Sequence, residues 1–298
     1  MINRLFWNNA EMRLRAGWRI LIQIIMISFP LAIFGLLGLY SGDKLAIKMT
    51  ATALPITFFS IWILGRFIDK RAYSDYGIQI QQKNWWFDYG FGWLAGFLTA
   101  CSLICILVVF GWADVALSSK LAADPVSFVM ALLVSLLAYA GVGIFEELLR
   151  TYQIRNITEG LAGTKTGITG AMILGVLLAG LWSVVMHLAS NDPLFLVYVL
   201  ATGVIYGFCF LWTKRAALAM AMHFAWDFTV SSIFQIGSVS EASLFFVTIR
   251  EMPDSGFEIL PMAGMIAKSI GLILILFWIK KREGKIETQK DIARPSLK

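Results

Sequence analysis

Residues 126–149 have the sequence VSFVMALLVSLLAYAGVGIFEELL, in which the first twenty residues carry no charge and two glutamates follow. A helix needs about 20 mostly apolar residues to cross the roughly 30 Å of bilayer hydrocarbon. The stretch is continuously apolar, whereas the strands of a membrane barrel alternate in polarity over about ten residues. It therefore predicts a transmembrane α-helix.

The rest of the 298-residue chain has the same character. Apolar residues make up 58% of it and charged residues only 15%, and the mean hydropathy is +0.74. These values exclude an ordinary soluble domain. The three cysteines lie in apolar runs, so the sequence predicts no disulfide. The net charge of +6 does not indicate a nucleic-acid partner, because the positive charges follow the membrane topology.

Eight segments are long and apolar enough to cross a membrane. We therefore predict an all-α integral membrane protein, a bundle of about eight transmembrane helices in a lipid bilayer. The predicted spans are 20–40, 49–65, 89–112, 126–149, 166–188, 194–212, 216–236 and 260–279.

The orientation follows from the lysines and arginines between the spans. Twenty of them lie in segments of one parity and four in segments of the other. Because positive loops stay in the cytoplasm, both termini are expected there. The predicted organisation is a basic cytoplasmic segment at 1–19, a polytopic membrane domain at 20–279 and a cytoplasmic tail at 280–298.

Few ionisable residues lie within the spans or at their ends. A charged side chain at membrane depth costs at least about 2.5 kcal/mol on insertion scales, so each needs a partner or a function. Both histidines of the chain belong to this group. Its members are Glu146, Glu147, Arg150, His187, His223, Asp227 and Lys268.

Helical spacing brings some of these residues onto one face. His223 lies four residues before Asp227, and Arg150 follows Glu146 by four residues and Glu147 by three. A cluster at a helix end or a polar contact between helices would explain the same spacing. For Lys268, we expect an acidic partner or a position near the interface.

Two chemical schemes fit these residues. His187, His223 and Glu146 are the ligand set of a hydrolytic zinc site, with the second glutamate as general base. Without metal, a glutamate deprotonates a water molecule while the histidines and Asp227 stabilise the oxyanion. Both schemes are hydrolysis, and the sequence leaves both open.

Residues 126–236 resemble the CPBP family of intramembrane proteases, which includes the CAAX prenyl endopeptidases and Abi-like proteins of bacteriocin processing or immunity. The most specific match is HFAWDF at 223–228, which supplies the family's His-x-x-x-Asn or Asp motif. His187 fits the family's second motif, although Ser183 stands where that motif has phenylalanine. The basic start RLRAGWR at 13–19 is similar to that of bacterial members.

The first family motif, Glu-Glu-x-x-x-Arg, is altered here. The segment EELLR has two residues between the glutamate pair and Arg150. Alignment on Arg150 makes Glu146 the catalytic glutamate and places Phe145 at the first position, whereas alignment on the pair requires a deletion. A deletion would rotate the following helix by about 100°. We therefore prefer Glu146 as the general base, with Glu147 as a supporting acid.

The resemblance implies an endopeptidase of a bacterial plasma membrane that hydrolyses a membrane-associated protein or peptide. Glu146 or Glu147 would activate water and Arg150 would hold the pair. His187, His223 and Asp227 would bind the oxyanion or a divalent metal such as zinc. Two alternatives stay open at this stage, a noncatalytic scaffold such as a bacteriocin immunity protein and a proton-coupled transporter.

Overall fold

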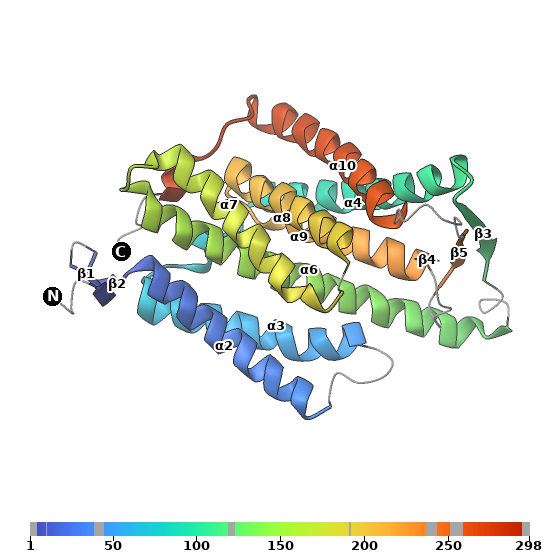
Figure 1. Ribbon diagram of the computed structural model, residues 1–298, viewed down its shortest axis with the longest axis horizontal. Helices are drawn as coiled ribbons and strands as arrows, with labels where there is room; N and C mark the ends of the chain where they lie inside the picture. The colour runs from blue at the N-terminus through green and yellow to red at the C-terminus, as the bar shows by residue number, and fades with distance from the viewer. Residues whose placement is uncertain are drawn as a thin grey trace.

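The computed structural model describes residues 5–9, 11–38, 45–118, 123–190, 192–236, 243–250 and 259–293. Residues 39–40 of the first predicted span and 294–298 of the predicted tail lie outside this part. Eight α-helices run through the described residues (Figure 1). They are α2 (Ala16–Leu36), α3 (Leu45–Ile63), α4 (Lys83–Val109), α6 (Pro125–Ala162), α7 (Gly167–Met186), α8 (Pro193–Thr213), α9 (Ala217–Phe228) and α10 (Ile259–Glu283).

The predicted helical membrane bundle is confirmed. Seven helical segments of the described chain are long and apolar enough to cross a bilayer, and α9 is the eighth helix of the bundle. Most helices begin and end within a few residues of the predicted spans, but α6 and α9 differ from them, and both carry candidate site residues.

Helix α6 is far longer than its predicted span. It has 38 residues and continues to Ala162, so that it is about 57 Å long at 1.5 Å per residue. The polar residues that follow the glutamates resemble a loop in sequence, but Arg150, Gln153 and Asn156 are buried inside the protein. The glutamate pair therefore lies near the middle of a continuous helix, which does not end where the predicted span ends.

Helix α9 is short and is enclosed by other helices. It has 12 residues and continues into the π-helix η4 (Thr229–Ile233). Gly92 and Gly96 of α4 contact it closely on one side and Gly143 of α6 on another, where an added Cβ would collide with α9 backbone atoms. Small residues allow membrane helices to approach in this way. Protein contacts, in place of lipid, thus cover the helix that carries His223.

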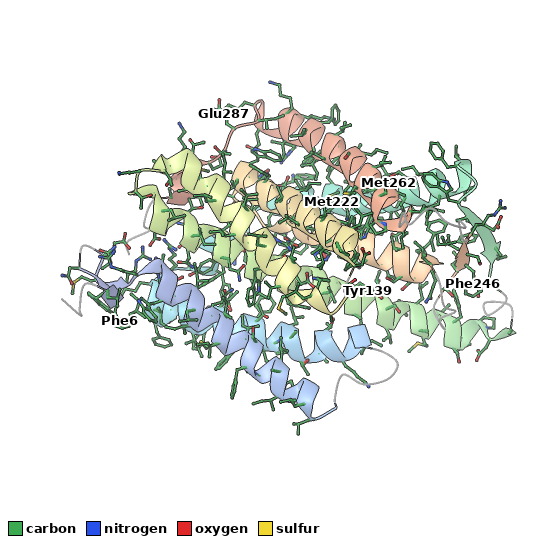
Figure 2. The ribbon with its side chains drawn as sticks, in the orientation of Figure 1. Phe6, Tyr139, Met222, Phe246, Met262 and Glu287 are labelled. Atoms are coloured by element: carbon green, nitrogen blue, oxygen red, sulfur yellow. The ribbon has the colours of Figure 1, made fainter. Side chains whose placement is uncertain are left out.

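A three-stranded sheet, absent from the sequence-based prediction, lies at one end of the bundle. The strand β5 (Phe245–Ile249) pairs antiparallel with β3 (Ala113–Leu117) and parallel with β4 (Phe234–Ile236). Figure 2 shows Phe246 of this sheet at one end of the molecule, and Phe6 and Glu287 toward the other. The first and last described segments therefore share one end of the bundle.

Buried charges join the beginning of the chain to the second half of α6. A short hairpin of β1 (Trp7–Asn8) and β2 (Arg13–Leu14) precedes α2. Arg13 and Arg19, both 1% exposed, pair with Glu159 of α6.

The π-helix η1 (Leu64–Asp69) ends in Asp69, which pairs with Arg19. Tyr76, in η2 (Tyr73–Tyr76), donates a hydrogen bond to Asp69 at 2.6 Å; burial and this carboxylate raise the Tyr76 pKa above its usual range.

Candidate active site

A cavity of about 200 Å³ lies where α6, α7, α8, α9 and α10 meet. It has room for several water molecules, since a water molecule occupies roughly 30 Å³ in the liquid. Five of the six predicted catalytic residues line it, and Glu147 lies directly behind the wall. The lining includes Glu146, Arg150, Ser183, His187, Tyr198, Thr202, Tyr206, His223, Trp226, Asp227 and Lys268.

The two glutamates of α6 have different surroundings. Glu147 is 1% exposed and is held by Arg150, which donates to its Oε1 atom. The second Nη atom of Arg150 donates to Ser183 Oγ of α7 at 2.9 Å. Glu146, turned by one residue around the helix, lines the cavity, and its side chain is 26% exposed. Arg150 therefore fixes Glu147, while the Glu146 carboxylate is accessible to a water molecule in the cavity.

His223 lies between three carboxylates. Its Nδ1 atom is 2.9 Å from Glu147 Oε1, and its Nε2 atom is 3.3 Å from Asp227 Oδ2 and 3.9 Å from Glu146 Oε2. The pairing of His223 with Asp227, predicted from their spacing of four, is thus observed. The contact with Glu147 crosses from α9 to α6 and could not be derived from spacing.

His187 reaches the cavity because α7 ends beside the middle of α6. The helix ends at Met186, the turn η3 (Leu188–Ser190) follows, and α8 begins at Pro193. Figure 1 shows that this hairpin turns about half-way along the much longer α6. The imidazole Nδ1 atom lies 2.8 Å from the backbone oxygen of Ser183. The position of His187 is therefore set by the hairpin.

The comparison with known families covers this part of the chain. Residues 127–229 match the Rce1-like family, described as type II CAAX prenyl endopeptidase Rce1-like. The match covers about a third of the chain, which over this region is similar to the Rce1-like family. No curated protein and no solved structure matches the chain. This similarity supports a membrane protease of the same type, and all six predicted catalytic residues fall within the matched part, the Rce1-like region.

Lys268 lies outside the Rce1-like region but lines the same cavity. It is 1% exposed, donates to the Tyr206 hydroxyl at 2.9 Å and lies with its Nζ atom 3.6 Å from the centre of the Trp226 ring. Aromatic rings enclose the ammonium group, and among the described residues no carboxylate forms a direct ion pair with it, in place of the acidic partner or interfacial position expected. A single lysine in an apolar span was the signal in the sequence.

The predicted metal ligands have other partners. Among the described residues, no three His, Cys, Asp or Glu side chains group as metal ligands would. Both ring nitrogens of His223 lie beside carboxylate oxygens, and His187 Nδ1 lies beside the backbone oxygen of Ser183. This arrangement does not fit a three-ligand zinc site without rearrangement. Zinc binding by His187, His223 and Glu146 stays a prediction.

Proposed function

We propose that the chain is an intramembrane endopeptidase in which Glu146 activates a water molecule to hydrolyse a peptide bond. One observation carries this proposal: the accessible carboxylate of Glu146 faces the cavity beside His223, while Glu147 is held by Arg150. A general base must reach the proton that it removes, and Glu146 meets this condition for water in the cavity.

The reaction follows from these positions. Glu146 takes a proton from water as the oxygen attacks the peptide carbonyl, and a tetrahedral oxyanion forms. The protonated Glu146 then gives its proton to the leaving nitrogen as the C–N bond breaks. Peptide hydrolysis of this kind needs no oxidant or second substrate, and the cavity supplies a place for the water.

The residues around His223 have a positioning role in this scheme. Glu147 faces Nδ1 and Asp227 faces Nε2, and a carboxylate can only accept hydrogen bonds. The two carboxylates therefore fix the plane of the imidazole ring. Arg150 holds Glu147 and through it the histidine, which extends the predicted role of Arg150.

The substrate class proposed is a protein or peptide bound to the membrane. The family description names CAAX prenyl endopeptidases, and the cavity lies inside a bundle of apolar helices. A peptide segment at the bilayer can approach such a site, whereas a soluble protein would have to enter lipid. We propose a bacterial plasma membrane as the location because the N-terminal sequence is similar to that of bacterial members.

Comparison of membrane peptides from cells with wild-type protein and with the variant His223→Ala tests the function. We expect one or more cleavage products to disappear in the variant, and turnover of the substrate so found to fall at least about 10²-fold. The variant must reach the membrane in wild-type amount. Unchanged cleavage in the His223→Ala variant would contradict the proposal. If the wild-type protein changes the behaviour of the cells but cleaves no peptide, a noncatalytic scaffold would be favoured.

The proposed orientation places both chain ends in the cytoplasm. One cysteine at a time, introduced at Lys285 after α10 or at Asp114 of β3, both exposed, tests it in a chain whose Cys101 and Cys105 are replaced by alanine and whose Cys209 is buried. The strand β3 lies at one end of the bundle, and Glu287, close to Lys285 in the sequence, lies toward the other (Figures 1 and 2). In intact cells, an impermeant maleimide should label Asp114→Cys and not Lys285→Cys. Both positions should react after the cells are opened, and the reverse pattern in intact cells would invert the topology.

A further inference from the structure

We propose that Lys268 is a further catalytic residue, whose ammonium group stabilises the oxyanion formed during peptide hydrolysis. This inference rests on the function proposed above and extends it beyond the Rce1-like region, which ends at residue 229. Three observations carry it: the place of Lys268 in the cavity, the hydrogen-bond partners of the two histidines, and the balance of charge around Glu146.

Lys268 is the cavity cation without an ion pair. Among the described residues, one arginine, Arg150, and one lysine, Lys268, line the cavity beside the two histidines. Arg150 is paired with Glu147, whereas in the described part of the chain no carboxylate forms an ion pair with Lys268. Its contacts are the Tyr206 hydroxyl and the Trp226 ring. A buried ammonium normally requires a paired anion, so an anion that forms in the cavity would complete its environment.

The packing of α10 holds Lys268 at this depth. Gly264 and Gly271 lie one turn before and about one turn after it on the buried face of the helix. A Cβ atom at Gly264 would lie 3.0 Å from a ring carbon of Tyr198, and one at Gly271 would collide with Met222 and Thr99. Close approach at both glycines therefore fixes the backbone that carries Lys268.

The two histidines have their N–H donors directed elsewhere. His187 Nδ1 faces a backbone carbonyl, which only accepts, so Nδ1 carries the proton and Nε2 of a neutral ring has none to donate. Both nitrogens of His223 face carboxylate oxygens. Asp227 itself is an acceptor when ionised. An oxyanion in this cavity needs a donor, and Lys268 has N–H groups beyond the one given to Tyr206.

The charges lead to the same residue. The negative charge of Glu147 is balanced by Arg150. The negative charge of Asp227 is balanced by His223 when both ring nitrogens donate. Glu146 and Lys268 are then the remaining opposite charges in the cavity lining. When Glu146 takes the water proton it becomes neutral, and its negative charge passes to the carbonyl oxygen. Lys268 is the cation left to balance that charge.

The first test compares Lys268→Met, Lys268→Arg and the control Lys281→Met, which makes the same change at an exposed position at the end of α10. Loss of an oxyanion donor lowers kcat by about 10²–10³-fold, so we expect this loss in Lys268→Met with KM little changed. Lys268→Arg keeps the charge and should recover part of kcat. Wild-type kcat in Lys268→Met would overturn the inference and leave the proposed function standing.

The second test measures binding and needs no turnover. In the variant Glu146→Gln, with and without Lys268→Met, the probe is a substrate-length peptide whose scissile amide is replaced by an anionic phosphonate, and the unmodified peptide is the comparison. An anionic analogue of the transition state should bind at least about 10²-fold more weakly without Lys268, while peptide binding stays unchanged. Equal weakening of both ligands would show a structural role and overturn the inference. Absence of cleavage by the wild type would contradict only the proposed function.

Discussion

Replacing Glu146 by glutamine should lower the rate of peptide hydrolysis by up to about 10⁴-fold, the upper range for a general acid–base group. Glutamine keeps the volume of the side chain and can hydrogen-bond to water, but it cannot take a proton. The carboxylate lines the cavity, and its ion pair with His223 is long, at 3.9 Å, so the substitution removes the base with little other change. The measurement is kcat for the membrane peptide whose cleavage depends on His223.

The matched variant is Glu147→Gln, one residue along the same helix. Glu147 is buried against Arg150 and His223, so the amide should weaken the support of His223 while leaving the base in place. We expect a measurable fraction of wild-type turnover. The opposite ranking would make Glu147 the general base, and equal loss in both variants would mean that the two carboxylates titrate as one coupled unit.

Contacts within one helix were accessible from the sequence. The spacing of four between His223 and Asp227 predicts a shared face, and the structure has their side chains 3.3 Å apart. The spacing of three between Glu147 and Arg150 gives an ion pair in the same way. Helix geometry alone determines such pairs. The sequence left open whether Arg150 pairs with Glu146 or with Glu147, and in the structure it pairs with Glu147.

Contacts between helices were not accessible in this way. The approach of His223 to Glu147 depends on glycines of α4 and α6 that admit α9 to the centre of the bundle. Hydropathy does not distinguish an apolar helix covered by protein from one covered by lipid, and this is why α9 resembled an ordinary span. Lys268 joins the cavity only because α10 packs beside α8.

The end of α6 was predicted too early for a related reason, because the residues that follow the glutamates are polar but buried. Arg150, Gln153 and Asn156 lower the hydropathy of a segment that is helical and enclosed. Side chains of other helices satisfy them, as Ser183 does for Arg150. The glutamate pair therefore has a rigid helix on both sides, which suits a site in which one carboxylate must be held and its neighbour left accessible.

The variant Arg150→Met should destabilise the protein by about 3–5 kcal/mol, the range for removing one partner of a buried ion pair. Arg150 is 5% exposed and donates to both Glu147 and Ser183. Without it, Glu147 is a buried carboxylate whose remaining described side-chain partner is His223. The measurement is the free energy of unfolding in detergent micelles, with Arg66→Met at an exposed position as the control, expected to change it by less than about 0.5 kcal/mol.

The double variant Arg150→Met, Glu147→Gln separates the ion pair from simple packing. If the cost of Arg150→Met is the unpaired charge of Glu147, removing that charge should restore part of the lost free energy, and the double variant should be more stable than Arg150→Met alone. Additive losses would mean that Arg150 contributes through its packing and its bond to Ser183. If the double variant is more stable than the wild type, the ion pair costs stability, and its role is to position His223.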